Sequence, residues 1–351
     1  MVWERLGSTS IGAGAVTNTA WKELTRSAAI STETHTITTP TFAAKDNLKI
    51  IIYGAGADNS GVRPRIQFNS DTGTNYAYRG YNNGTEQTST DANFIYISES
   101  DVDQAMISVL DITNTASKEK MVTGHTTRSA NTNAGIPPHR WETAGKWANT
   151  SDQITSISMV AYSTTAQGFS AGWEIVVLGC DNDETDTGSN FWQELGTTTK
   201  TSNGNEIEVA GLAAKKYLLI EYHTKPNGNT DDIKLLFNSD NSGSDYAIRR
   251  SGLVTGSDTS TSQNFAKISA NNGAVNRDGF VYLINVSGNV KLGISVAILN
   301  EGGNGAGNVP LIWITDIKYV TTSGQITSIQ MQDQGSGDFA SGSRITVYGA
   351  D

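Results

Sequence analysis

The sequence predicts an all-β protein built from two tandem antiparallel β-sandwich domains of the jelly-roll kind, which derive from an internal duplication and follow an N-terminal arm. Gln153–Ile157 and Gln325–Ile329 have the same sequence, QITSI, so a unit of about 160 residues occurs twice. Only 37% of residues are hydrophobic and 17% are charged, and the remainder is rich in Gly, Ser, Thr and Asn, which suits short strands joined by turns. Apolar side chains alternate with a period of two in short runs.

The two copies stay in register along their whole length. Trp21 matches Trp192 and Phe68 matches Phe237, so only the loops between core elements vary in length. We expect the following boundaries: an arm at 1–20, a first sandwich at 21–181, an acidic linker at 182–191 and a second sandwich at 192–351.

Alternating runs mark the expected strands, roughly eight in each copy. In the first copy they lie at 48–53, 66–68, 75–79, 94–97, 106–112 and 173–177, and in the second at 217–222, 235–237, 245–249, 265–268, 280–286 and 345–347. Only 101–106 suggests a short helix.

A β-hairpin is predicted in each copy by two alternating runs that flank a turn rich in Asn, Asp and Gly. In the first copy the turn is Asn69–Gly73, and we expect Asp71 to bond its own backbone as an Asx turn. Calcium binding through the loop carboxylates of Asp71, Asp240 and Asp245 is the alternative.

Charge and cysteine content restrict the partners. The net charge of -10 and the pI near 4.9 argue against a nucleic-acid partner, because phosphate binding requires a basic surface. Cys180 is alone, so we expect no intrachain disulfide. The first residues lack the pattern of a signal peptide, and no apolar run reaches the 18 or more residues of a membrane span, so no membrane partner is expected.

No catalytic constellation is recognisable, and we expect neither an enzyme nor a cofactor or metal site. The histidines have no counterpart in the other copy and no metal-ligand spacing: His35, His125, His139 and His223. There is no nucleophile elbow and no phosphate-binding loop. Nothing marks the carboxylate pair that glycoside hydrolysis requires.

Aromatic residues supply the candidate interface. Trp141 and Trp313 occupy matching positions, which predicts a core role for both. Tyr81 has no aromatic counterpart and is a candidate for a sugar-stacking platform. Trp3 and Leu6 lie on the arm, where an apolar side chain requires a docking place. They pack either on their own domain or on a neighbouring subunit.

Several runs resemble virion-associated β-sandwich proteins of tailed bacteriophages. They are residues 68–79, 120–125, 146–155 and 176–179 of the first copy. The second copy is less similar at 289–294 and 318–321, which raises the question of whether both copies contact the same partner.

The resemblance implies a non-enzymatic virion structural protein, and we expect a capsid decoration (cement) protein on the outer head surface. Its implied partners are the major capsid protein and other copies of itself, with a trimer as the expected oligomer, in a virion assembled in the host cytoplasm. The alternative is a tail- or fibre-associated protein that binds host glycans. A secreted carbohydrate-binding module and an enzyme are less favoured.

Overall fold

A computed structural model describes residues 21–54, 62–98, 105–129, 131–162, 168–181, 189–228, 232–252, 259–269, 275–300, 309–335 and 337–351. The arm with Trp3 and Leu6, most of the predicted linker, and residues 101–104 of the predicted helix lie outside the described residues. Met106, the last residue of that predicted helix, begins a strand instead.

The chain divides into two compact units. Unit 1 consists of residues 1–130 and 140–192, and unit 2 of residues 131–139 and 193–351. Segment 131–139 is bonded within unit 2: the Ser262 amide donates to the Ala134 carbonyl (2.9 Å), and Arg249 Nε donates to the Pro138 carbonyl (2.8 Å). The alternating pattern of the sequence gave no sign of this segment.

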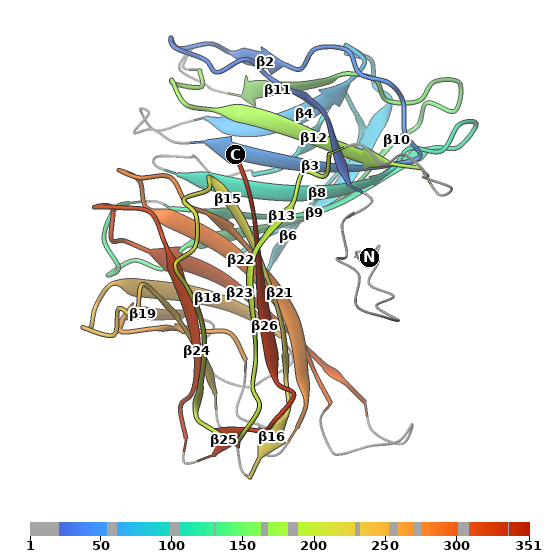
Figure 1. Ribbon diagram of the computed structural model, residues 1–351. Helices are drawn as coiled ribbons and strands as arrows, with labels where there is room; N and C mark the ends of the chain where they lie inside the picture. The colour runs from blue at the N-terminus through green and yellow to red at the C-terminus, as the bar shows by residue number, and fades with distance from the viewer. Residues whose placement is uncertain are drawn as a thin grey trace. The chain divides into compact units, whose positions relative to one another are not determined.

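Unit 1 is a sandwich of two antiparallel sheets (Figure 1). The eight-stranded sheet has the order β1-β12-β3-β8-β9-β10-β5-β6, and the four-stranded sheet has the order β2-β11-β4-β7. The strands are β1 Lys22–Arg26, β2 Thr36–Thr38, β3 Asn47–Gly54, β4 Arg63–Phe68, β5 Tyr76–Asn82, β6 Thr85–Ala92, β7 Ile95–Tyr96, β8 Met106–Thr113, β9 Lys120–Arg128, β10 His139–Trp147, β11 Ile157–Tyr162 and β12 Glu174–Cys180.

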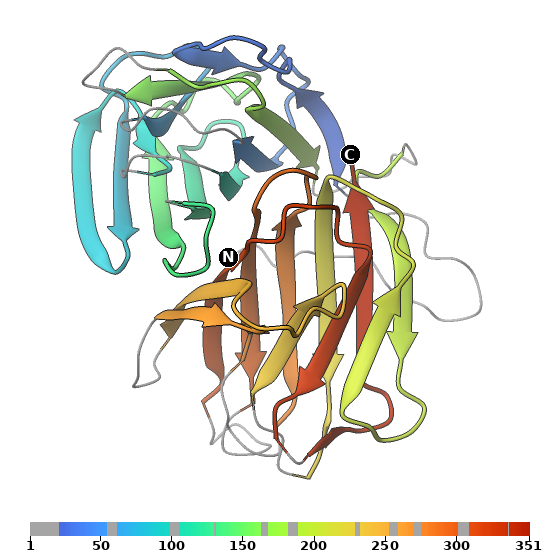
Figure 2. The ribbon, with the colours of Figure 1, turned by 90° about the vertical axis from the view of Figure 1, so that its left-hand side faces the viewer.

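Unit 2 is a second antiparallel sandwich (Figure 2), whose two main sheets repeat the strand order of unit 1. Its larger sheet has the order β13-β26-β15-β21-β22-β23-β18-β19, its smaller sheet has the order β14-β24-β17-β20, and β16 pairs with β25. The strands are β13 Gln193–Thr199, β14 Glu206–Ala210, β15 Tyr217–Thr224, β16 Pro226–Asn227, β17 Ile233–Phe237, β18 Tyr246–Gly252, β19 Thr259–Gln263, β20 Ala266–Lys267, β21 Arg277–Ile284, β22 Lys291–Leu299, β23 Leu311–Tyr319, β24 Ser328–Asp333, β25 Asp338–Phe339 and β26 Arg344–Ala350.

The predicted fold class, two all-β sandwiches, is confirmed. The expected eight strands per copy were too few, since the described residues form twelve in unit 1 and fourteen in unit 2. The missed strands include β6 (TEQTSTDA), which is polar throughout, and β2 (Thr36–Thr38), which is too short to show a period. Within the described residues, no helix has the length and apolar character that a membrane crossing requires.

Each unit has its own hydrophobic core between its two sheets. In unit 1, Ile50 and Ile175 of the larger sheet pack in one cluster with Ile66 and Met159 of the smaller sheet. Unit 2 buries a separate cluster of the same kind. The predicted core roles of Trp141 and Trp313 are confirmed, because both are almost fully buried.

The repeated QITSI sequence forms the loop that leads into β11 and β24. In unit 1, Asn69 Oδ1 accepts from the amides of Thr155 (2.9 Å) and Ser156 (3.1 Å). Asn114 is fully buried, and its amide group bonds both the N–H (2.7 Å) and the carbonyl (3.2 Å) of Ile154.

Unit 2 holds its QITSI loop in the same way. Asn238 Oδ1 accepts from the amides of Thr327 (2.8 Å) and Ser328 (3.2 Å). Asn285 bonds the N–H (2.6 Å) and the carbonyl (3.1 Å) of Ile326. The loop therefore repeats because two asparagine clamps fix its backbone in each unit.

Candidate functional site

Asp71 of the hairpin turn bonds within its own unit. Its Oδ1 accepts from the Gly73 amide (2.8 Å), which confirms the predicted Asx turn. Its Oδ2 accepts from Trp147 Nε1 (2.7 Å) and Asn75 Nδ2 (2.9 Å). Burial opposes ionisation, but the hydrogen bonds from Trp147, Asn75 and Gly73 outweigh it and hold the pKa of Asp71 below its ordinary value.

Asp240 repeats this arrangement in unit 2. Its Oδ1 accepts from the Ser242 amide (3.1 Å), and its Oδ2 accepts from the Tyr319 hydroxyl (3.0 Å). Burial and the nearby Asp240 carboxylate raise the pKa of Asp245. The described residues contain no cluster of three or more His, Cys, Asp or Glu side chains suited to a metal, and calcium binding by the loop carboxylates stays a prediction.

A buried lysine also donates a hydrogen bond to a loop carbonyl in each unit. Lys120 Nζ donates to the Asn149 carbonyl (3.1 Å), and Lys291 Nζ donates to the Thr321 carbonyl (2.9 Å) at the equivalent place. Both lysines are fully buried, and burial lowers the pKa of Lys291 to about 8.

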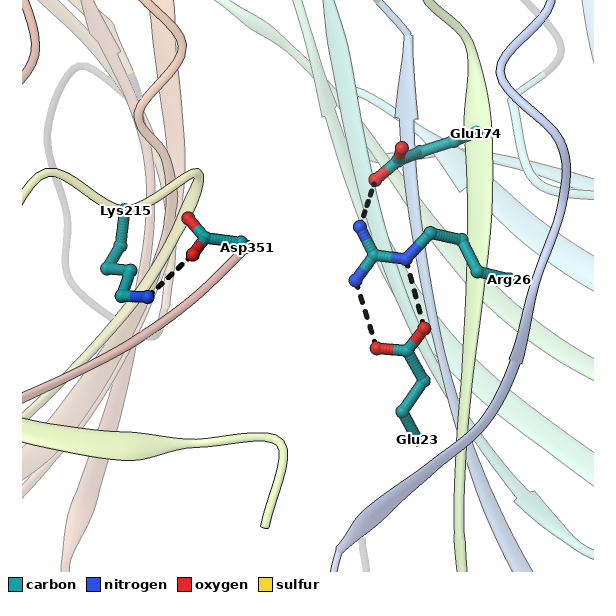
Figure 3. Close-up of polar contacts among 5 residues, drawn as sticks. All are labelled: Glu23, Arg26, Glu174, Lys215 and Asp351. Atoms are coloured by element: carbon teal, nitrogen blue, oxygen red, sulfur yellow. Dashed lines mark hydrogen bonds and ion pairs between the residues drawn. The ribbon is translucent and has the colours of Figure 1, made fainter. Parts of the chain in front are cut away.

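Ion pairs join the last residue of each copy to its own unit. Lys45 bonds Asp181 (2.9 Å) in unit 1, and Lys215 bonds Asp351 (2.6 Å) in unit 2. Figure 3 shows the second pair, and it also shows Arg26 between Glu23 (2.9 Å) and Glu174 (3.5 Å) on strands β1 and β12.

At the Arg26 position unit 2 has Thr197, whose hydroxyl replaces the guanidinium. Thr197 donates to Glu194 (2.8 Å) and bonds the Thr346 hydroxyl (3.0 Å). Across both units, the polar side chains that repeat therefore stabilise turns, loops and sheet edges, and sites that differ between the units are better candidates for function.

The candidate residues from the sequence do not form one site in the described residues. Trp3 and Leu6 lie outside them. Tyr81 lies on β5, where it is partly buried and donates to Glu86 Oε1 (3.4 Å). Arg79 also pairs with Glu86, and together they cover one face of the β5–β6 hairpin.

A different group of aromatic residues gathers in unit 1, beside the smaller sheet. Phe94 and Tyr96 contact edge to face (4.7 Å between ring centroids), and Tyr78 contacts Tyr96 in the same geometry (5.6 Å). Tyr162 contacts Tyr96 (6.3 Å) and is 39% exposed. We call this group, together with Arg63 and Arg65 of β4, the aromatic–arginine face.

Arg65 lies at the centre of the aromatic–arginine face. Its guanidinium carbon is 4.4 Å from the centre of the Phe94 ring and 5.3 Å from that of Tyr162. Nε is buried and has no hydrogen-bond partner. Desolvation lowers the pKa of Arg65, against the opposing influence of Tyr96 and Tyr162, and no carboxylate contributes. Arg65 is therefore a partly desolvated cation without an acidic partner among the described residues.

The core of unit 1 holds the aromatic–arginine face in position. Trp141 Nε1 donates to the Tyr96 carbonyl (3.3 Å) and to Thr143 Oγ1 (2.7 Å). Thr143 Oγ1 donates to the same carbonyl (3.2 Å). In the adjacent strands Arg65 lies opposite Tyr96 on one side and Val160 on the other.

The corresponding outer face of unit 2 differs in part. Lys234 and Lys267 occupy the places of Arg65 and Tyr96, and Lys267 pairs with Asp232. Glu206 and Glu208 of β14 occupy the places of Thr36 and Thr38 of β2. Lys234 also lies over an aromatic ring, 4.9 Å from the centre of Phe265, as Arg65 lies over Phe94. The face of unit 2 is therefore acidic only along its edge strand β14.

Comparison of the two copies could have identified this face from the sequence. The prediction of Tyr81 used only one of the aromatic residues that the first copy has and the second copy lacks. Tyr96 and Tyr162 are aromatic in the first copy alone, as Tyr81 is, and period-two alternation places Tyr162 and Val160 on one face. What marks the face is that several residues on neighbouring strands differ between the first copy and the second.

No family model matches the sequence, and no curated protein matches it. Among solved structures, the LG1-3 region of the laminin alpha2 chain is similar at 8% identity with a TM-score of 0.22, over 90% of this chain and 64% of that one. Domains LG4-5 of the mouse laminin alpha1 chain are similar at 10% identity with a TM-score of 0.19, over 94% of this chain and 91% of that one. The chain thus spans less than two thirds of the first of these structures, the similarity to laminin G domains is weak, and the tandem β-sandwich fold rests on the strand topology itself.

Proposed function

We propose that this protein is a non-enzymatic structural component of a bacteriophage virion, a capsid decoration protein on the outer surface of the head. One observation carries the proposal: two sandwiches of identical topology keep the same internal polar contacts, yet present outer faces of different chemistry. The resemblance of 68–79 and 146–155 to virion proteins supports it.

A rigid scaffold with two distinct faces suits attachment to a repeating lattice. A preformed surface loses little conformational entropy on binding, and many weak contacts on one particle add to a high avidity. The net charge of -10 favours solubility before assembly. The proposed partners are the major capsid protein and other copies of this chain, and neither nucleic acid nor membrane is among them.

The position of the protein on the intact particle tests the proposal. Gold-labelled antibody against this chain should decorate the head in electron micrographs, and label on the tail alone would contradict a decoration role. Deletion of residues 1–20 should lower the number of copies per particle, and unchanged occupancy would show that the arm does not contribute to attachment.

A tail- or fibre-associated glycan-binding protein is the second candidate. The aromatic–arginine face favours it, because the partly exposed ring of Tyr162 is of the kind that stacks on a sugar. A glycan array distinguishes the two: a decoration protein gives no hits, whereas hits that disappear in Tyr162→Ala would establish the glycan-binding alternative.

A further inference from the structure

We propose that the aromatic–arginine face of unit 1 docks on the acidic edge strand β14 of the four-stranded sheet in unit 2 of a second copy of this chain. The inference goes beyond the proposed function and does not depend on it, because the contact would form in the purified protein without any phage particle.

Arg65 indicates that the aromatic–arginine face has an acidic partner. A desolvated cation is normally compensated by a carboxylate or by several hydrogen bonds. Arg65 is partly buried between Phe94 and Tyr162, and its Nε has no hydrogen bond. The rings hold the planar guanidinium in place, which prepares its remaining N–H groups for a carboxylate.

The outer face of unit 2 supplies carboxylates at a matching spacing. Glu206 and Glu208 are two residues apart on β14, where they alternate with the buried core residues Ile207 and Val209 and so lie on the outer face. Arg63 and Arg65 are likewise two residues apart on β4. In each strand such side chains lie on one face about 7 Å apart, so two basic groups can meet two acidic groups when the sheets lie face to face.

The glutamates are only partly satisfied within unit 2. Glu206 Oε2 accepts from Gln330 (3.1 Å), and Glu208 Oε1 accepts from Ser239 (3.4 Å). Neither glutamate forms an ion pair with a described residue, whereas Asp232, which precedes β17, pairs with Lys267. Each carboxylate therefore keeps lone pairs for an incoming guanidinium.

A protein partner suits this face better than a sugar. The guanidinium of Arg65 lies over one side of the rings of Phe94 and Tyr162, which reduces the ring surface on which a sugar could stack. Arginine and tyrosine packed together are typical of the central residues of protein interfaces. Because the two faces differ, the contact is head to tail, and it generates a closed ring or a filament.

Sedimentation velocity of the full-length protein over a concentration series tests the proposal. The wild type should form an oligomer that dissociates on dilution. Arg65→Glu should raise the dissociation constant at least tenfold, and so should Glu206→Lys with Glu208→Lys. The chain that combines Arg63→Glu, Arg65→Glu, Glu206→Arg and Glu208→Arg should recover association, because the charges are exchanged across the contact.

Lys118→Glu is the matched control, since Lys118 is an exposed cation of unit 1 away from the aromatic–arginine face. It should leave association unchanged. Glu206→Gln with Glu208→Gln alters only exposed or partly exposed side chains, so it tests the contact even if Arg65→Glu fails to fold.

Three outcomes would overturn the proposal. They are a wild type that is monomeric at every concentration, an oligomer that survives both charge reversals, and equal weakening by Lys118→Glu. A monomer that binds an acidic saccharide on an array only while Arg65 is present would assign the aromatic–arginine face to a glycan instead.

Discussion

Two different aromatic side chains donate the same hydrogen bond to a turn carboxylate at equivalent positions of the two units. The indole N–H of Trp147 binds Asp71, and the hydroxyl of Tyr319 binds Asp240. What persists is a donor that reaches the turn carboxylate from the last residue of β10 or β23. The chemistry of the contact, rather than the residue type, is therefore common to both copies.

Removal of either donor should destabilise its unit in a pH-dependent way. Trp147→Phe and Tyr319→Phe keep an aromatic ring but lose a bond to a charged group, which is worth roughly 1.5 to 3 kcal/mol. The hydrogen bonds hold the pKa values of Asp71 and Asp240 below the ordinary value in the folded state. Their stabilisation is present above the pKa of the unfolded chain and is lost as the pH falls through the folded pKa.

Denaturant unfolding at pH 7 and at about pH 3 measures the effect, since the carboxyl of an unfolded chain titrates near pH 3.9. The deficit of each variant should shrink in acid. An equal deficit at both pH values would mean that the loss comes from ring packing instead of the carboxylate.

Lys291 should make stability rise with pH. Burial lowers its pKa to about 8 in the folded protein, whereas an unfolded lysine titrates near 10.4. Between these values the unfolded chain binds more protons, so the free energy of unfolding increases with pH, by up to about 1.4 kcal/mol per pH unit for one fully coupled group. Below the folded pKa the lysine is charged in both states and the desolvation penalty is fully present.

Lys291→Met removes this titration. The free energy of unfolding of the wild type, relative to that of the variant, should increase between pH 7.5 and 10 in denaturant titrations. Parallel pH profiles for the two proteins would refute the assignment. Burial also raises the pKa of Tyr246, but this effect is common to both proteins and cancels in the comparison.

The loop before β11 shows how one element is fixed by side chains from distant parts of the chain. Asn114→Ala removes the acceptor for the Ile154 amide and the donor to the Ile154 carbonyl, both buried. We expect a loss of about 3 kcal/mol or more from unit 1, since each unsatisfied buried group costs roughly 1 to 3 kcal/mol. Calorimetry measures the loss.

Asn114→Asp separates the two roles of the amide, because it keeps the acceptor and loses the donors. The comparison applies above the pKa of the new carboxyl. There Asn114→Asp should be less destabilising than Asn114→Ala only if the hydrogen bond from the Ile154 amide contributes more stability than the bond to the Ile154 carbonyl. Asn285→Ala, the matched change, should destabilise unit 2 similarly. If Asn285→Ala has no effect, the two clamps are not equivalent.

The alternating sequence pattern predicted the sandwich class, because the position of a residue within its own strand decides whether its side chain faces the core. Ile66 and Phe68 alternate on one face, and both are fully buried. Strand β6 could not be predicted, since its polar sequence carries no apolar period and its place depends on pairing with β5. Segment 131–139 joins unit 2 through bonds to Arg249 and Ser262 that no local pattern encodes.

The candidate site was predictable only in part. The sequence indicated that unpaired aromatics of the first copy deserved a functional interpretation, and it named Tyr81. The aromatic–arginine face depends on Phe94, Tyr96 and Tyr162 from strands and loops that meet only after the smaller sheet has assembled. The periodicity of single strands could therefore not predict that these residues come together.

In the whole molecule, duplication separates stability from recognition. Both units keep the same topology, asparagine clamps and loop-binding lysines, so either sandwich can fold around its own core. The smaller sheets are then free to diverge on their outer faces. Unit 1 presents Arg63 and Arg65 on strand β4, and unit 2 presents Glu206 and Glu208 on strand β14. This is the pattern expected if copies of the chain recognise each other through unlike surfaces.

Self-association through these faces should depend on salt. The paired charges lie at the surface, where each ion pair contributes about 0.2 to 1 kcal/mol, and salt near 0.5 M screens charges beyond a few ångströms. Two such pairs predict that the dissociation constant rises roughly twofold to thirtyfold between 0.05 and 0.5 M salt.

The aromatic residues predict that some association persists at high salt, because burial of Tyr162 and Phe94 does not depend on charge. Sedimentation at both salt concentrations measures the two contributions. Arg65→Gln should flatten the salt dependence, whereas Tyr162→Ala should weaken association equally at both salt concentrations. An oligomer whose dissociation constant ignores salt would place the contact on another part of the surface, because opposed arginines and glutamates cannot be insensitive to screening.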